Sequence, residues 1–132
     1  MIRPSPVVLA VGQCFETEAA FDAARSALSR EGIKLFRAAD QHCASIWICE
    51  ADPAVVVIDL SLTEGSPLAV ADFCSYRRPN ARVILLGGGK LMADGSLFGH
   101  VGNAAAMLPD PVPGPDLLAL ISFHSAHRMA MA

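Results

Sequence analysis

The chain has 132 residues, a mass of 13.9 kDa and a formal net charge of −3. This length suits one domain with a single core, and the acidic balance argues against nucleic acid or an anionic membrane as a partner. Apolar residues make up 53% of the chain, which indicates a compact fold. No apolar run approaches the roughly 18 residues of a spanning helix, and residues 1–6 are too short and proline-broken for a signal peptide. We therefore expect a cytoplasmic protein without a membrane segment.

Apolar runs alternate with helix-like segments along the chain. The first run, Pro6–Val11, predicts a buried strand, and the helical spacing that follows predicts a helix over Thr17–Arg30, closed by Gly32. The remaining predicted strands are Ile33–Arg37, Ala54–Leu60, Val83–Leu86 and Ala104–Leu108. A second helix is capped by Asp40 and runs to Cys49 or Glu50, with Ile46 and Trp47 facing inward, and a third is opened by Ser66 and Pro67 and ended by Pro79 and Asn80. The last two predicted helices are Lys90–Phe98 and about Pro115–Arg128.

Strands that alternate with helices predict βαβ units and a parallel sheet covered on both faces. The three runs Val7–Val11, Val55–Ile58 and Val83–Leu86 are nearly all aliphatic, so we expect them to be central. Ile33–Arg37 carries charge near both ends, as an edge strand should. The sequence predicts one domain over residues 1–132, with its core at about residues 7–127.

Asp59 directly follows the apolar run Ala54–Ile58. In an open α/β sheet, ligands bind just beyond the carboxyl ends of the strands, so this carboxylate is a candidate functional residue. The alternative interpretation is structural: Asp59 accepts hydrogen bonds from backbone N–H groups at the junction of strand and loop.

The spacing of cysteines and histidines predicts no metal site. The four cysteines are Cys14, Cys43, Cys49 and Cys74. They form no CxxC pair, and we interpret them as small buried hydrophobic side chains, with a redox role for Cys14 as the alternative. The histidines are equally scattered. His124 and His127 could share one helical face, where we expect them to cap and solvate the end of the last helix.

Gly87–Gly89 and Lys90 invite comparison with a phosphate-binding loop. The GxxxxGK[ST] spacing is absent, because Leu91 follows Lys90, and no Rossmann fingerprint follows the first strand. We interpret these glycines as a flexible loop. A small-ligand or nucleotide-binding flavodoxin-like domain that uses Gly12 and Gly87–Gly89 stays as an alternative.

The alternation of elements, their spacing and the strand Val55–Asp59 resemble the CheY-like receiver domain of bacterial response regulators, over about Val7–His127. The resemblance implies the flavodoxin-like fold, with strand order 2-1-3-4-5. In that family an acid pair after the first strand binds magnesium, and an aspartate after the third strand accepts a phosphoryl group from a histidine kinase. A Ser or Thr after the fourth strand senses that group, and a Lys before a proline after the fifth strand contacts it.

Matched residue by residue, the chain keeps only the phosphoacceptor, at Asp59. Gly12 and Gln13 stand at the acid pair, Gly87 at the Ser or Thr, and Asp110 at the Lys. Mg²⁺ prefers carboxylate oxygens in near-octahedral geometry, and Asp110 would place an anion where the phosphoryl group needs a cation. We therefore expect no magnesium site and no cofactor.

Glu16 and Glu18, just beyond the first strand, could be proposed as substitute metal ligands. Acidic residues at this place more often begin a helix and interact with its positive end. We interpret them in that way.

The resemblance thus implies a degenerate receiver, or pseudo-receiver: a stand-alone, non-enzymatic domain that acts in two-component or phosphorelay signalling through protein–protein contact. No output domain is expected after the last helix. The partner would be a histidine kinase or a downstream effector, and a homodimer is a further option. The expected partner surface includes Leu91, Met92, Phe98 and His100, with residues 116–127. The alternative within the same fold is a working phosphoacceptor at Asp59 with unusual metal use.

Overall fold

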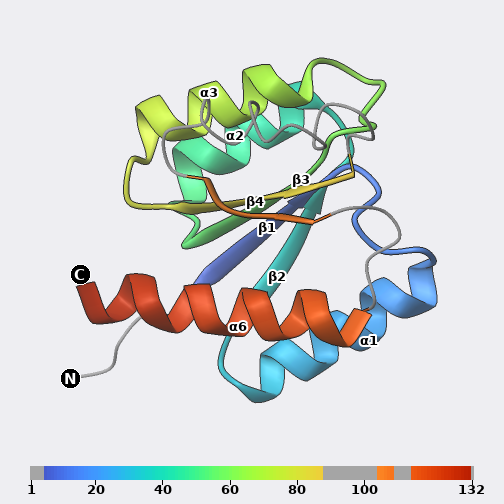
Figure 1. Ribbon diagram of the computed structural model, residues 1–132, viewed down its shortest axis with the longest axis vertical. Coiled ribbons are helices and arrows are strands. Elements are labelled where there is room, and N and C mark those ends of the chain that lie inside the picture. The colour runs from blue at the N-terminus through green and yellow to red at the C-terminus, as the bar shows by residue number, and fades with distance from the viewer. Residues whose placement is uncertain (1–4, 88–103, 109–113, 132) are drawn as a thin grey trace.

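The computed structural model describes residues 5–87, 104–108 and 114–131, and strands and helices alternate along this part of the chain (Figure 1). The elements are β1 Val7–Val11, α1 Glu18–Arg30, β2 Lys34–Ala38, α2 Gln41–Ala51, β3 Val55–Asp59, α3 Pro67–Arg77, β4 Arg82–Leu86, β5 Ala104–Leu108 and α6 Gly114–Met131. Every strand lies within one residue of its prediction at each end. The helix predicted at Lys90–Phe98 lies outside the described residues. Within them, no helix combines the length and apolar character of a membrane span.

The strands form one parallel sheet in the order β2-β1-β3-β4-β5, which confirms the predicted topology. β1, β3 and β4 are central, as their aliphatic composition predicted, and β2 lies at an edge. In the register of the central strands, Val11 pairs with Ile58 and Asp59 pairs with Leu86. The residues that follow β1, β3 and β4 therefore meet at one end of the sheet.

Alternate residues of the central strands point to opposite faces, and each face has its own core. Leu9, Val56 and Leu85 belong to the core beneath α2 and α3. Val8, Val57 and Ile84 belong to the core beneath α1 and α6. Figure 1 shows the resulting three layers, with α2 and α3 on one side of the sheet and α1 and α6 on the other. Burial on both faces explains why β1 is apolar throughout and why β3 and β4 are apolar at every position except Asp59 and Arg82.

Side-chain caps fix where three helices begin. Each cap oxygen accepts a hydrogen bond from a backbone N–H in the first turn: Thr17 Oγ1 from Ala20 at 3.0 Å, Asp40 Oδ1 from Cys43 at 2.7 Å and Ser66 Oγ from Ala69 at 3.2 Å. Pro67 occupies the first turn of α3. The caps Asp40 and Ser66 confirm the sequence-based prediction, and Thr17 caps the helix that it was expected to join.

The side chains of Ile46 and His124 lie differently from the prediction. Ile46 was expected to face inward but is 44% exposed, and α2 buries Ala44 and Ile48 instead. Because α2 is apolar around much of its circumference, its pattern does not define one inward face. His124 was expected at a solvated helix end but is only 9% exposed, because it follows Leu117 and Ile121 on the buried face of α6. The side chain of His127 lies outside the described residues.

Candidate functional site

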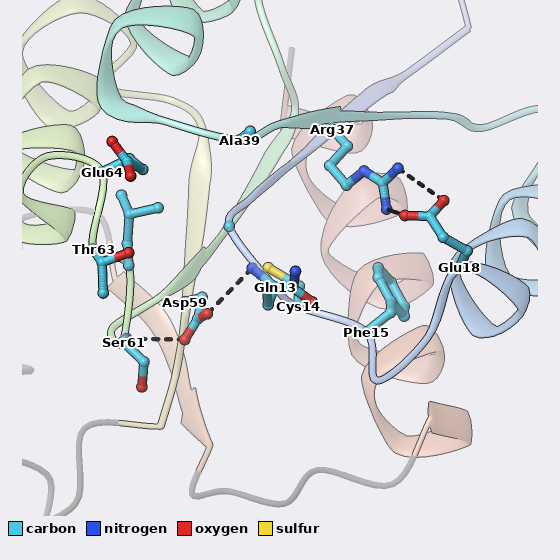
Figure 2. Close-up of a pocket in the computed structure, with 12 residues that line it drawn as sticks. Gln13, Cys14, Phe15, Glu18, Arg37, Ala39, Asp59, Ser61, Thr63 and Glu64 are labelled. Atoms are coloured by element: carbon cyan, nitrogen blue, oxygen red, sulfur yellow. Dashed lines mark hydrogen bonds and ion pairs between the residues drawn. The ribbon is translucent and has the colours of Figure 1, made fainter.

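A cavity of about 400 Å³ lies at the carboxyl ends of β1, β2 and β3 (Figure 2). Its walls are the loop between β1 and α1, the end of β2 and the loop that follows β3. The site therefore occupies the place where an open parallel sheet binds ligands. Asp59, Gly12 and Gln13 all line this cavity, as their positions after neighbouring strands predicted.

Asp59 is half-buried and uses both carboxylate oxygens to hold backbone N–H groups. Its Oδ2 accepts a hydrogen bond from Gln13 N at 3.2 Å, and its Oδ1 accepts one from Ser61 N at 2.9 Å. Figure 2 shows the carboxylate between these two loops. The side chain thus joins the loop after β1 to the loop after β3, which agrees with the structural interpretation made from the sequence.

Gly12 occupies a position that an acidic residue would fill only with strain. Its φ is +85°, in the left-handed region that favours glycine. A Cβ atom built there would lie 3.1 Å from Asp59 Cβ and 3.4 Å from Asp59 Oδ2. Any side chain at this position would therefore meet both an unfavourable backbone conformation and the carboxylate itself.

Gly87 has a similar backbone, with φ of +80°. Its N–H donates to Leu108 O at 2.8 Å and joins the end of β4 to β5. A Ser or Thr in this conformation would be strained, since L-residues with larger side chains rarely adopt it. Sequence alone cannot distinguish a glycine that is merely tolerated from one that the backbone requires.

Glu18 and Arg37 form a bidentate ion pair across the cavity wall. Arg37 Nη1 lies 2.7 Å from Glu18 Oε1, and Arg37 Nη2 donates to Glu18 Oε2 at 3.0 Å. The guanidinium also lies 4.3 Å from the centre of the Phe21 ring. The hydrogen bond to Arg37 lowers the pKa of Glu18. Glu18 begins α1 as predicted, but the sequence did not reveal its partner on β2, 19 residues away.

Cys14 turns its thiol into the protein. Its Sγ donates to Val11 O at 3.3 Å and to Val57 O at 3.5 Å. Burial, and then the negative charge of Asp59, raise the pKa of this thiol far above its ordinary value. A thiol that stays protonated is a poor nucleophile, so the environment disfavours a redox role.

The other cysteines fit the sequence interpretation unevenly. Cys74 is buried, as predicted, and Cys49 is intermediate in exposure. Cys43 is exposed, contrary to prediction, because it lies in the solvent-facing first turn of α2.

The donor set fits magnesium poorly. At the acid-pair positions, Gly12 offers no side chain and Gln13 offers only a neutral amide, whereas Mg²⁺ prefers carboxylates. Asp59 already accepts two backbone hydrogen bonds, and Glu18 is paired with Arg37. In the part of the chain that the structure describes, no three His, Cys, Asp or Glu side chains are grouped to hold an ion.

Several predicted site residues lie outside the described residues. They are Asp110 at the lysine position and the expected partner surface of Leu91, Met92, Phe98 and His100.

No protein-family model and no curated protein sequence matches the chain. Solved structures do match it. A CheY-like response regulator receiver domain protein from Methanospirillum hungatei is 21% identical with a TM-score of 0.76, over 96% of this chain and 98% of that one. The signal receiver domain of a putative Luxo repressor protein from Vibrio parahaemolyticus is 19% identical with a TM-score of 0.75, over 96% and 94%.

A third match is a response regulator protein from Burkholderia pseudomallei with a phosphorylated aspartic acid, a calcium ion and citrate. It is 20% identical with a TM-score of 0.70, over 96% of this chain and 72% of that one. These similarities, together with the strand order and the cavity at the strand ends, show that the chain has the fold of CheY-like response regulator receiver domains.

Proposed function

We propose that this chain is a pseudo-receiver: a non-enzymatic signalling domain that acts through protein–protein contact, without ordinary magnesium-dependent phosphorylation of Asp59. The receiver fold itself suggests two-component signalling. The proposal that Asp59 is not phosphorylated in the ordinary magnesium-dependent way rests on the contact between Gly12 and Asp59. There the left-handed backbone conformation and the 3.1 Å approach to Asp59 Cβ would strain and crowd the carboxylate that the resemblance places after β1.

Phosphoryl transfer depends on a cation that neutralises the charge developing on the transferred group. Receiver folds can carry both features, since the Burkholderia pseudomallei structure holds a phosphorylated aspartic acid and a calcium ion. In this chain, the described residues at the cavity supply Asp59 and Glu64 as carboxylates outside the Glu18–Arg37 pair. Asp59 ends β3 and Glu64 lies in the loop that follows, so these two anions do not reproduce a pair of acids after β1.

Asp59 has a different task in this proposal. By accepting from Gln13 N and Ser61 N, it holds the loop after β1 against the loop after β3. Gln41 supports the second loop, because its Oε1 accepts from Ser66 N at 2.8 Å and its N–H donates to Glu64 O at 3.0 Å. The domain then presents one constant shape to a histidine kinase or a downstream effector.

The test is an NMR titration of the full chain with Mg²⁺ at millimolar concentration, followed by beryllofluoride. We expect the amide signals of Gln13, Ser61 and Gly87 to stay unchanged, because no carboxylate pair holds the cation. Asp59→Asn is the control, since it removes the carboxylate and keeps the shape of the side chain. Saturable shifts that disappear in Asp59→Asn would overturn the proposal.

The alternative, a working phosphoacceptor, is favoured by one observation: Asp59 is half-exposed in an open cavity at the end of β3. Incubation with acetyl phosphate and Mg²⁺, followed by mass spectrometry, addresses it directly. A phosphorylated peptide that contains Asp59 would support this alternative, and an unmodified chain would support the pseudo-receiver.

A further inference from the structure

A second cavity, of about 520 Å³, lies between the C-terminal half of α1 and the edge strand β2. We name it the basic groove, because three exposed cationic side chains line it: Arg25, Arg30 and Lys34. Among the described residues of its lining none is acidic, although the whole chain carries a net charge of −3. The ion pair of Arg25 with Asp22 is long, at 3.6 Å, and exposed, so it holds the guanidinium weakly.

The edge strand β2 borders the basic groove with residues from both of its faces. Leu35 belongs to the core beneath α1, whereas Phe36 packs against the opposite core and stacks on Trp47. Both residues line the groove. In the described part of the chain, the outer edge of β2 is open, because β2 pairs with β1 alone.

The backbone of β2 shows which groups point toward this edge. Lys34 N donates to Pro6 O at 2.9 Å, and Ala38 O accepts from Gly12 N at 2.9 Å, so these residues face β1. In a parallel pair, alternate residues bond to the same neighbour. The N–H and C=O groups of Leu35 and Arg37 therefore point outward, away from β1.

We propose that the basic groove binds an extended acidic segment of a partner protein, which adds a strand beside β2. The inference rests on the proposed function, in which the chain acts through protein contact, and it specifies the chemistry of that partner. Leu35 and Arg37 offer main-chain hydrogen bonds to the added strand. Arg25, Arg30 and Lys34 make the groove positively charged, which complements the carboxylates of the segment.

A polypeptide accounts for more of the groove than a small anion does. Besides its cations, the groove is lined by the partly buried Phe36 and lies beside the outward backbone of β2. Inorganic phosphate would use the cations alone. An extended chain that carries acidic residues also bonds to the outward backbone of β2, and its apolar side chains pack against the groove wall.

The test uses a short synthetic peptide of alternating Glu and Val, with blocked termini, titrated into the isotope-labelled full chain. We expect saturable shifts of the Leu35 and Arg37 amides and binding that weakens as salt is added. The triple variant Arg25→Gln, Arg30→Gln, Lys34→Gln should weaken binding by about tenfold or more. Arg77→Gln, which removes an exposed arginine on α3 outside the groove, is the matched control and should bind as the unmodified chain does.

Two further peptides distinguish an acidic strand from other possible occupants of the basic groove. A peptide with Lys in place of Glu should not bind, and a Glu–Val peptide N-methylated at alternate residues should bind more weakly, because it lacks strand donors. Equal binding of the Lys peptide, or inorganic phosphate that reproduces the same shifts, would overturn the proposal. These signals lie at β2 and those of the Mg²⁺ titration lie at Gln13 and Ser61, so failure here is distinguishable from failure of the pseudo-receiver proposal.

Discussion

Gly12 and Asp59 illustrate how single residues set the chemistry of this site. The positive φ of Gly12 brings its backbone against the carboxylate, and that approach orients Gln13 N toward Asp59 Oδ2. An acidic side chain introduced at this position would therefore meet both an unfavourable backbone conformation and the Asp59 carboxylate.

Gly12→Ala should destabilise the protein by about 2 kcal/mol, because alanine pays for both the left-handed conformation and the crowding against Asp59. Gly32→Ala is the matched control. Gly32 has a similar φ of +79°, but nothing lies within 4 Å of its Cβ direction, so we expect about 1 kcal/mol from conformation alone. Urea denaturation measures both free energies. Equal losses would show that the crowding at Gly12 is negligible.

Asp59→Asn should lower the free energy of unfolding by about 0.5–1.5 kcal/mol, because the amide keeps one acceptor oxygen and loses the other. The longer bond, from Gln13 N at 3.2 Å, is the one that we expect to break. Asp59→Ala removes both acceptors and should lose more. Thermal and urea unfolding of the two variants check this order, which a greater loss for the asparagine variant would contradict.

At the scale of elements, capping decides how the helices that support the cavity begin. Asp40 caps α2 with a carboxylate, whereas Ser66 caps α3 with a hydroxyl. The hydrogen bond from Cys43 N lowers the pKa of Asp40 below its ordinary value. The two helices pack side by side over the same core, but only one of their caps titrates.

The stability contributed by the Asp40 charge should therefore be present above the pKa of the unfolded chain, about 3.9. It should be lost as the pH falls through the lowered pKa of the folded state. Asp40→Asn keeps the cap and should flatten the acid side of the plot of Tm against pH. Ser66→Ala should lower Tm by a similar amount at every pH, because no charge is removed. An unchanged acid slope in Asp40→Asn would contradict the assignment.

At the scale of the whole molecule, the sheet could be predicted because its strands are specified locally. Runs such as Val55–Ile58 are buried on both faces, so strand positions, parallel pairing and the central place of β1, β3 and β4 follow from composition. The site could be predicted only in part. The position of Asp59 follows from the end of β3, but its partners Gln13 and Ser61 depend on loop conformations that side-chain patterns do not encode.

Long-range side-chain pairs were missed for a related reason. Glu18 and Arg37 meet only because β2 lies beside the start of α1, and neither residue carries a local signal for the other. The inward side of α2 was also misjudged at Ile46, since apolar residues surround that helix. Pattern therefore predicts the layers of this fold better than the contacts between them.

Hydrogen exchange should show the architecture of the sheet directly. Amides of Val8–Val11 and Val55–Ile58 should exchange most slowly, because they lie in central strands. Within β2, the amides of Lys34 and Phe36 should be protected and those of Leu35 and Arg37 should exchange quickly, since only the first two face β1. Uniform protection along β2 would mean that its outer edge is already paired.

The stacking of Trp47 on Phe36 has an optical consequence. Trp47 is the only tryptophan of the chain, and its ring centre lies 4.5 Å from that of Phe36, which lines the basic groove. Neither ring lines the cavity around Asp59. The fluorescence emission of Trp47 should therefore change in intensity or wavelength when a peptide strand binds beside β2. It should not change when a ligand binds at the Asp59 carboxylate. Trp47 is thus an intrinsic fluorescent probe of the outer edge of β2.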